Sequence, residues 1–201
     1  GFRFPIIQRL LWIGLLVLLV SPAVEAQRKK VGVVLSGGGA KGVAHIGVLQ
    51  VLEKAGIPVD IIVGTSMGSI VGGLYAIGYS ADQLDSLVRV QDWMFLLSDK
   101  VNRYDLPFGE KEQDGKYLLS FPFDRGKKRP SGFISGQNVY NLFSDLTIGY
   151  HDSLDFLQLP IPFACVAADM FHREEIVMKS GNLVRAMRAS MAIPGFFTPV
   201  R

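Results

Sequence analysis

The sequence predicts an α/β domain built around a mainly parallel central sheet. Residues 31–55 and 59–77 each combine a strand rich in β-branched residues, a glycine-rich turn and a helical pattern of apolar residues. Two such units in succession favour parallel strands joined by right-handed crossovers. The composition agrees, because 49% of the 201 residues are hydrophobic and only 19% are charged, which excludes a disordered polyelectrolyte.

Hydrophobic periodicity and turn residues define the expected elements. Gly56 and Pro58 end the first helix, and Ser80 with Gln83 forms a capping box at the start of the third. Helices are expected over residues 41–55, 67–77, 80–90, 137–146 and 182–189. Strands are expected over residues 31–35, 59–63, 117–123, 162–168 and 174–178. The segments 98–116 and 124–135 are expected to be irregular, because they are rich in glycine, proline and charge.

Residues 1–26 have the features of a secretory signal peptide. Two arginines precede the apolar run Leu10–Val20, and a stretch of small residues suited to a signal peptidase ends at Ala26. The apolar run has 11 residues, whereas a membrane-spanning helix needs about 20. We therefore expect residues 27–201 to form the mature domain, exported to the periplasm, the outer membrane or the medium.

Charge, cysteine and histidine content exclude several classes of function. Residues 27–201 keep 19 of the 21 basic and 17 of the 18 acidic residues, a net charge of only +2, so a nucleic acid partner is not expected. The single cysteine, Cys165, excludes an internal disulfide and a cysteine-based zinc site, and we expect it in the core. Three scattered histidines do not support a metal site. No metal and no other cofactor are therefore expected.

The first glycine-rich turn has the composition of an anion-binding loop. In the run Ser36-Gly37-Gly38-Gly39-Ala40-Lys41-Gly42, between a strand and a helix, glycines can point several N–H groups at the positive end of the helix. Its spacing also matches the dinucleotide motif G-x-G-x-x-G. That motif needs an acidic residue at the end of the second strand, and here Asp60 lies at its start. A dinucleotide site is therefore not expected.

The second turn predicts a nucleophilic serine. The run Gly64-Thr65-Ser66-Met67-Gly68 is a G-x-S-x-G pattern between a strand and a helix, where a strained turn exposes the serine hydroxyl and the glycines remove crowding Cβ atoms. Acyl transfer also needs N–H donors aimed at the developing oxyanion. Because the two strands are neighbours, we expect Gly37, Gly38 and Gly39 to supply them, together with the N–H of Met67.

These residues together resemble the patatin-like phospholipase family. The resemblance spans about residues 30 to 200 and rests on the segments Leu35–Gly42, Ala44–Leu49, Val63–Ile70 and Arg188–Gly195. It implies a three-layer α/β/α domain that hydrolyses acyl esters of phospholipids or other lipids without a metal. It also implies that Ser66 is the nucleophile. The resemblance assigns the oxyanion loop and its support to Gly37, Gly38, Gly39, Lys41 and Gly42, while Gly64 and Gly68 flank the serine.

The resemblance also implies a catalytic base that this chain does not contain. The family uses a Ser-Asp dyad, whose Asp lies in an Asp-Gly-Gly or Asp-Gly-Ala turn soon after the segment matching Ala192–Pro199. This chain begins at Gly1 and stops at Arg201, before such a turn, so we expect a fragment whose base lies beyond residue 201. Exported members often resemble passenger domains with a C-terminal outer-membrane barrel. The resemblance therefore allows the same attachment here, and contact with a membrane surface.

Other titratable residues suit the role of base less well. Asp114, followed by Gly115, is expected in a surface turn. Asp169 directly follows a predicted strand, at a position to which the family resemblance gives a structural role, and we expect it to cap a turn or helix. His45 falls within the first helix, whereas His151 and His172 lie in polar loop segments.

Two alternative functions stay open at the level of sequence. A Ser-His-Asp triad esterase of the α/β-hydrolase type would require His151 or His172 near Ser66. A non-catalytic lipid-binding passenger domain would keep the glycine turns but lack the base. The basic segment 125–129 and the apolar run 93–97 offer lipid contacts, although a solvated loop and ordinary helix packing are the simpler interpretations.

Overall fold

The computed structural model describes residues 28–98 and 132–200 of the chain. The predicted signal peptide, the predicted strand at 117–123, Asp114 and the basic segment 125–129 lie outside these ranges. Within these ranges, the residues from Val31 onward form one structural unit.

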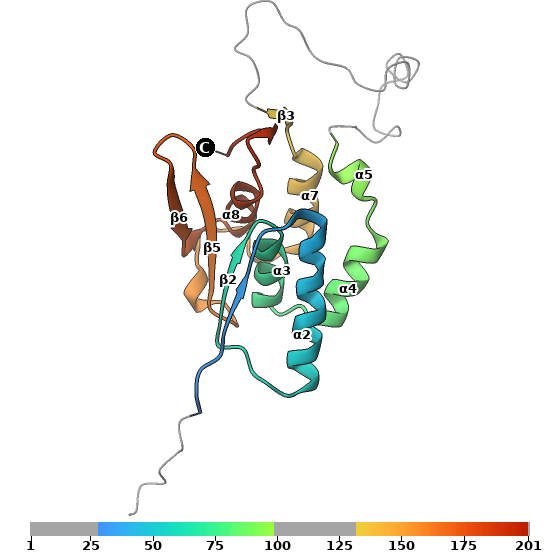
Figure 1. The fold of residues 1–201 in the computed structure, drawn as a ribbon, viewed down its shortest axis with the longest axis vertical. Coiled ribbons are helices and arrows are strands. Elements are labelled where there is room, and N and C mark those ends of the chain that lie inside the picture. The colour runs from blue at the N-terminus through green and yellow to red at the C-terminus, as the bar shows by residue number, and fades with distance from the viewer. Residues whose placement is uncertain (1–27, 99–131, 201) are drawn as a thin grey trace, which may run out of the picture. The chain divides into compact units, whose positions relative to one another are not determined.

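Four strands form the central sheet, in the order β1-β2-β5-β6 (Figure 1). The first three, β1 (Gly32–Leu35), β2 (Ile61–Thr65) and β5 (Phe163–Asp169), run parallel to one another. The fourth, β6 (Glu174–Met178), pairs antiparallel with β5 and forms a hairpin with it. The expected α/β class with a mainly parallel sheet is thereby confirmed.

All five predicted helices are present, with small shifts at their ends. The 3-10 turn η1 (Gly39–Val43) opens the first of them, and the run at 93–97 forms one further short helix. The α-helices are α2 (Ala44–Lys54), α3 (Met67–Ala76), α4 (Ala81–Val90), α5 (Trp93–Leu96), α7 (Gln137–Leu146) and α8 (Leu183–Ser190). The capping box of α4 forms as predicted, with Gln83 N–H donating to Ser80 Oγ. Within the described residues, no helix combines the length and apolar character needed to cross a bilayer.

Short strands that pair with distant segments of the chain are not predicted from the sequence. The sequence predicts irregular backbone over 124–135, which is wrong for β3 (Gly132–Ile134), because this strand pairs in parallel with β8 (Gly195–Phe197). Likewise, β4 (Leu154–Asp155) pairs with β7 (Ser180–Gly181), and η2 (Phe156–Gln158) follows β4. Elements of two or three residues are too short to leave a hydrophobic period.

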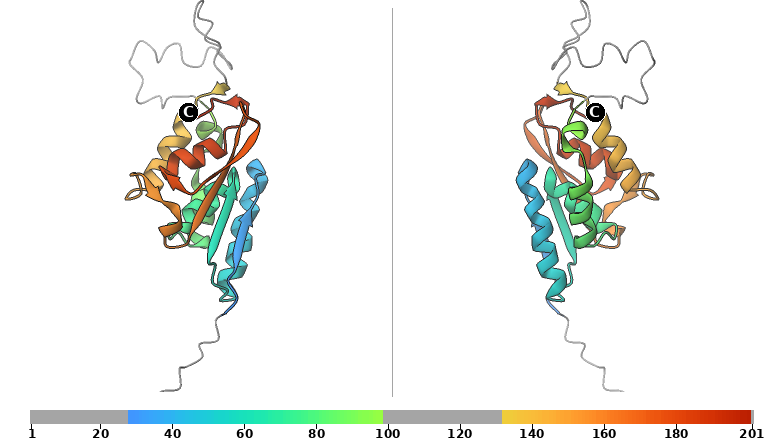
Figure 2. Two further views of the ribbon diagram at one scale, coloured as in Figure 1. Left: turned by 90° about the vertical axis from the view of Figure 1, so that its left-hand side faces the viewer. Right: turned by 90° about the vertical axis from the view of Figure 1, so that its right-hand side faces the viewer.

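Helices cover one face of the sheet (Figure 2). On that face α3 packs against β1, β2 and β5, and α8 packs against β5, over the buried side chains of Leu35, Ile62 and Phe163. On the opposite face Val34 is 78% exposed and Val177 is also exposed. Of the three layers that the family resemblance implies, the described residues therefore form two.

The helix α3 lies close to the sheet because two of its residues lack a side chain. A Cβ atom at Gly72 would lie 2.7 Å from Cγ2 of Ile62, and one at Gly73 would lie 2.9 Å from the sulfur of Met187 in α8. Both neighbours are fully buried. The packing of α3 between the sheet and α8 therefore depends on these glycines.

A buried arginine joins α8 to the β3–β8 pair. Arg188 is 4% exposed and donates hydrogen bonds to the carbonyl oxygens of Ser135 (2.7 Å) and Thr198 (3.0 Å). Its guanidinium carbon lies 4.8 Å from the ring centre of Phe197, at cation-π distance. These contacts place the β3–β8 pair at the end of the sheet where the parallel strands finish (Figure 1).

We predict that Gly72→Val lowers the free energy of unfolding by about 1–3 kcal/mol, because the new side chain meets the fully buried Ile62. Gly47→Val is the matched control: Gly47 lies in the helix α2, and no atom lies within 4 Å of a Cβ placed there. Its change should stay within about 0.5 kcal/mol. Urea unfolding followed by far-UV circular dichroism measures both, and equal losses would contradict the close packing of α3.

Candidate active site

The two predicted glycine turns lie beside each other. Leu35 at the end of β1 pairs with Gly64 near the end of β2, so the turns that follow the two strands start at the same level of the sheet. A Cβ atom placed on Gly37 would lie 3.3 Å from the Cβ of Ser66. The first turn and the serine of the second are therefore immediate neighbours.

The backbone at Ser66 is strained. Its φ is +52° and its ψ is −120°, and within the described residues only Arg173 is another non-glycine residue with positive φ. Strain of this kind costs on the order of 1–3 kcal/mol and persists only where the surroundings hold it. The conformation matches the sharp strand-to-helix turn that the G-x-S-x-G pattern predicts.

Hydrogen bonds hold both backbone groups of Ser66. Its N–H donates to Oγ of Ser190 (2.7 Å). Its carbonyl oxygen accepts from Oγ of Ser69 (2.7 Å), from the N–H of Ser69 (2.9 Å) and from the N–H of Ile70 (3.2 Å). The side chain of Ser66 makes no capping bond to α3. Hydrogen bonds to the backbone of Ser66 thus hold the turn, and the hydroxyl of Ser66 does not cap α3.

Three motif glycines have a steric reason to be glycine. A Cβ at Gly68 would lie 2.5 Å from the carbonyl carbon of Leu35, and one at Gly64 would lie 2.6 Å from Cα of Ser69. A Cβ at Gly42 would lie 2.6 Å from Cβ of Met67. Because these neighbours are mostly backbone atoms, they cannot rotate away. The contacts bring η1 and the start of α3 together around the serine.

The first turn owes its shape to one glycine in particular. Gly39 has φ +53°, in the left-handed region that favours glycine, whereas Gly38 has φ 168° and is extended. The N–H of Lys41 donates to the carbonyl oxygen of Gly38 (3.2 Å) and closes the turn. Beside it, Met67 is the first residue of α3, so its N–H has no acceptor within that helix. The N–H of Met67 is therefore free of helical bonding next to the serine, where the positive end of α3 favours negative charge.

Two residues without a predicted role position these turns. Ser190, the last residue of α8, accepts from the N–H of Ser66 and donates to the carbonyl oxygen of Val166 in β5 (2.5 Å). The Nε2 of His45 lies 2.8 Å from the carbonyl oxygen of Ser36 and therefore carries the proton of this bond. The sequence places Ser190 in a recognisable segment, but its partner Ser66 lies 124 residues away.

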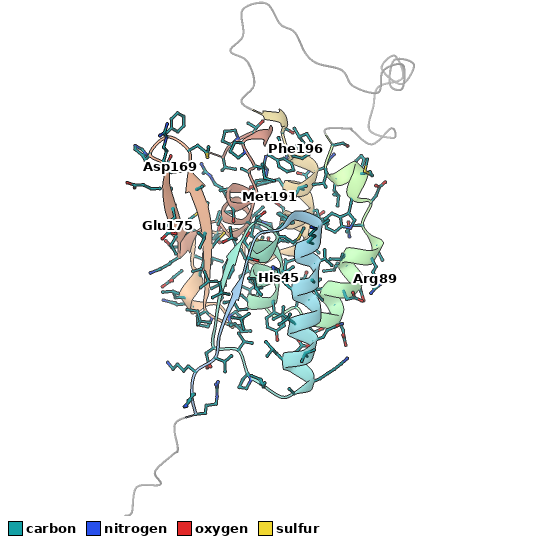
Figure 3. All side chains as sticks on the ribbon, viewed as in Figure 1. His45, Arg89, Asp169, Glu175, Met191 and Phe196 are labelled. Atoms are coloured by element: carbon teal, nitrogen blue, oxygen red, sulfur yellow. The ribbon has the colours of Figure 1, made fainter. Side chains whose placement is uncertain are left out.

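The described Asp-His pair lies at the tip of the β5–β6 hairpin. Nδ1 of His172 lies 2.6 Å from Oδ2 of Asp169, while Oδ1 of Asp169 accepts from the N–H groups of Phe171 (2.7 Å) and His172 (3.2 Å). Asp169 therefore caps a turn, as expected. The hydrogen bond between the two side chains lowers the pKa of Asp169 and raises the pKa of His172. Figure 3 shows Asp169 at this tip, well apart from His45 on α2.

Two further candidates, His151 and Cys165, lie elsewhere in the fold. His151 precedes β4, and its backbone carbonyl oxygen, not its imidazole, accepts a hydrogen bond from the side chain of Asn182. Cys165 is fully buried, as expected, and burial raises the pKa of its thiol to about 11, which keeps it protonated at neutral pH. Among the residues that the structure describes, no cluster of three or more His, Cys, Asp or Glu side chains could hold a metal ion.

Comparison with known proteins relates this chain to patatin-like phospholipases. The sequence profile of a family described as patatin-like phospholipase matches residues 33–201. Patatin-like phospholipase domain-containing protein 6 of Homo sapiens is 32% identical over 170 residues, and lysophospholipase NTE1 of Candida albicans is 32% identical over 176 residues. Each match covers 85% of this chain and 10% of the relative. The chain therefore spans about a tenth of the length of these relatives.

Among solved structures, the fold is similar to that of full-length ExoU in complex with full-length SpcU from the type III secretion system of Pseudomonas aeruginosa. The TM-score is 0.51 at 20% identity, over 82% of this chain and 38% of the other. At this identity the similarity concerns the fold alone.

We predict that Ser190→Ala lowers the free energy of unfolding by about 1–3 kcal/mol, because it leaves the N–H of Ser66 and the carbonyl of Val166 without their shared partner. The matched control is Ser86→Ala, since Ser86 also bonds a backbone carbonyl but lies exposed on α4. Its change should stay within about 0.5 kcal/mol. Urea denaturation compares the two, and a loss at Ser190 no larger than that of the control would show that the link to the turn is unimportant.

Proposed function

This chain belongs to the patatin-like phospholipase family, and we propose that it is a serine lipid acyl hydrolase of the phospholipase A or lipase-esterase type. The observation that carries the proposal is the strained turn that presents Ser66 between the Gly37–Gly39 turn and the start of α3. Relatives named as phospholipase and lysophospholipase support a lipid ester as the substrate class.

The proposed reaction begins with attack by Oγ of Ser66 on the ester carbonyl. The hydroxyl proton passes to a base, and the tetrahedral oxyanion takes hydrogen bonds from N–H groups of the Gly37–Gly39 turn and of Met67. When the ester bond breaks, the leaving alcohol takes up the proton and the acyl group stays on Ser66. Water then attacks the acyl-serine, releases the fatty acid and restores the hydroxyl.

We place the base of this reaction on an Asp beyond residue 201, which would form a Ser-Asp dyad. Support comes from three acidic or imidazole groups of the described residues, each of which already has a structural partner. Asp60 accepts from the N–H of Val31 (2.6 Å), Asp169 caps the hairpin turn, and His45 holds the first glycine turn.

One observation favours a second candidate function. Asp169 and His172 form the kind of hydrogen-bonded pair that a Ser-His-Asp triad uses. Asp169 ends β5, which pairs with β2, the strand that precedes Ser66, and His172 lies in the turn after β5. A triad esterase would need His172 to reach the hydroxyl of Ser66 when substrate is bound. Its side chain is 75% exposed at the hairpin tip in this structure.

We predict that Ser66→Ala in the full-length protein lowers hydrolysis of a short-chain chromogenic ester by about 10³-fold or more, with an unchanged far-UV circular dichroism spectrum. The change removes one oxygen that makes no capping bond. A fluorophosphonate probe should label Ser66 in the unaltered protein, and peptide mapping identifies the labelled residue. More than a tenth of the original activity in this variant would rule out Ser66 as the nucleophile.

The matched variant His172→Asn separates the two mechanisms within the same assay. It keeps a hydrogen-bonding side chain at the hairpin tip but cannot carry a proton as imidazole does. Full activity of His172→Asn agrees with the dyad, whereas a loss as large as that of Ser66→Ala would establish the triad.

We also predict that a fragment of residues 27–201 is essentially inactive toward the same ester, and that extension by the next few tens of residues restores activity. A serine hydroxyl needs a base within about 3 Å. The fragment should also bind a hydrophobic dye, because Val34 and Val177 on the open face of the sheet are exposed. Full activity of the fragment would contradict the proposed dyad and direct attention to His151, His172 and Asp169.

A further inference from the structure

Large apolar side chains are exposed at the end of the sheet where Ser66 lies. At the tip of the β5–β6 hairpin, Phe171 is 94% exposed and Met170 is 59% exposed. After α8, Ile193 is 55% exposed and Phe196 is 45% exposed. We call these four residues the apolar rim. Figure 3 shows Phe196 and the hairpin tip along the same upper edge of the molecule.

The register of the strands places the rim beside and beyond the serine. Thr65, the residue before Ser66, pairs with Val166, so β5 continues past the level of Thr65 for three more residues, to Asp169, a reach of about 10 Å. The segment that carries Ile193 starts next to Ser66, because Ser190 bonds to the N–H of that serine. The hairpin tip therefore projects outward past the candidate nucleophile.

The hairpin tip is held in one shape. Besides the two N–H bonds to its side chain, Asp169 accepts at its carbonyl oxygen from the N–H of Arg173 (2.8 Å), and Arg173 has φ +59°. The pair with His172 closes the turn from the outside. The exposure of Met170 and Phe171 is thus imposed by a fixed turn, so no entropy of loop ordering opposes insertion of the two side chains into an apolar phase.

We propose that the apolar rim is a bilayer-contact surface, which inserts into the boundary between lipid headgroups and acyl chains and brings Ser66 to its substrate. This inference rests on the proposed function, since it takes a membrane lipid as the substrate. Aromatic and long flexible apolar side chains suit that boundary. An acyl ester of a phospholipid lies at the same depth, so a serine just behind the projecting tip is placed to receive it.

The charges around the tip indicate which lipid surface fits. Three acidic residues, Asp169, Glu174 and Glu175, outnumber the basic Arg173 and His172 along the hairpin. Attraction to anionic lipids is therefore not the main source of binding. The apolar contacts of the rim should suffice for a zwitterionic bilayer, such as phosphatidylcholine.

A protein partner fits the rim less well than a bilayer does. A stable protein interface covers about 800 Å² on each side with complementary shape, whereas the rim consists of two separate projections. A partner seated across them would also cover the approach to Ser66. A bilayer adapts to separate projections and supplies the substrate at the same time.

Binding of the full-length protein to phosphatidylcholine vesicles, measured by flotation, tests the proposal. The double variant Met170→Ser/Phe171→Ser should bind at least tenfold more weakly than the unaltered protein, but hydrolyse a soluble short-chain ester at the unaltered rate. The matched control is Ile148→Ser, because Ile148 is 75% exposed in the loop after α7, a helix that starts at the rim end and leads away from it. This control should bind as the unaltered protein does.

A second variant keeps the test independent of any loss of folding. In the variant F171W, the introduced indole should shift its emission to shorter wavelength when vesicles are added, and bromine on the acyl chains should quench it. Failure of the protein to bind vesicles, equal binding by the double variant, or absence of quenching would overturn the proposal. Protection of the indole by a protein partner in place of lipid would overturn it as well.

The vesicle-binding experiment can succeed or fail independently of the test of the proposed function. Ser66→Ala should bind vesicles as tightly as the unaltered protein, because the rim is unchanged. If no ester is hydrolysed but binding still depends on Met170 and Phe171, the proposed function fails and the bilayer-contact surface stands. If hydrolysis depends on Ser66 but vesicle binding is unchanged by the substitutions at Met170 and Phe171, the proposed function stands and the bilayer-contact surface fails.

Discussion

The close approach of two stretches of backbone, one at the end of β1 and one at the start of α3, creates the candidate site. A Cβ atom at Gly68 would lie only 2.5 Å from the carbonyl carbon of Leu35, so the two segments can meet only where a side chain is absent. Gly64 and Gly42 remove the neighbouring obstacles. The approach brings Gly37 against Ser66, and the candidate site arises from this arrangement.

The same approach explains why the serine is strained and how the strain is held. A turn this sharp takes Ser66 to φ +52°, at a cost on the order of 1–3 kcal/mol. Hydrogen bonds to its N–H and carbonyl group contribute about 0.5–1.5 kcal/mol each, and Ser190 and Ser69 supply the side-chain partners. Because the backbone N–H and carbonyl of Ser66 make the hydrogen bonds that hold the turn, its hydroxyl is available for chemistry.

The parallel sheet then gathers other features at the same end. Strands that run in one direction finish at one edge, where the turns after β1 and β2, the end of α8 and the β5–β6 hairpin all meet. The buried Arg188 holds the β3–β8 pair at this edge. The candidate nucleophile and the apolar rim therefore share one side of the molecule as a direct result of strand direction.

Features that depend on neighbouring residues could be predicted from local sequence patterns. The strand-turn-helix units, the capping box at Ser80 and the strained turn at Ser66 were predictable, because each follows from a local pattern of apolar residues, caps or glycines. Only the tertiary structure showed that Ser190 holds the serine, that β3 pairs with β8, and that His172 pairs with Asp169 at an exposed tip. The first two contacts join residues that are distant in the chain, and the place of the third depends on how β5 and β6 pack. Such contacts leave no periodic signal, because packing of the whole chain decides which distant residues meet.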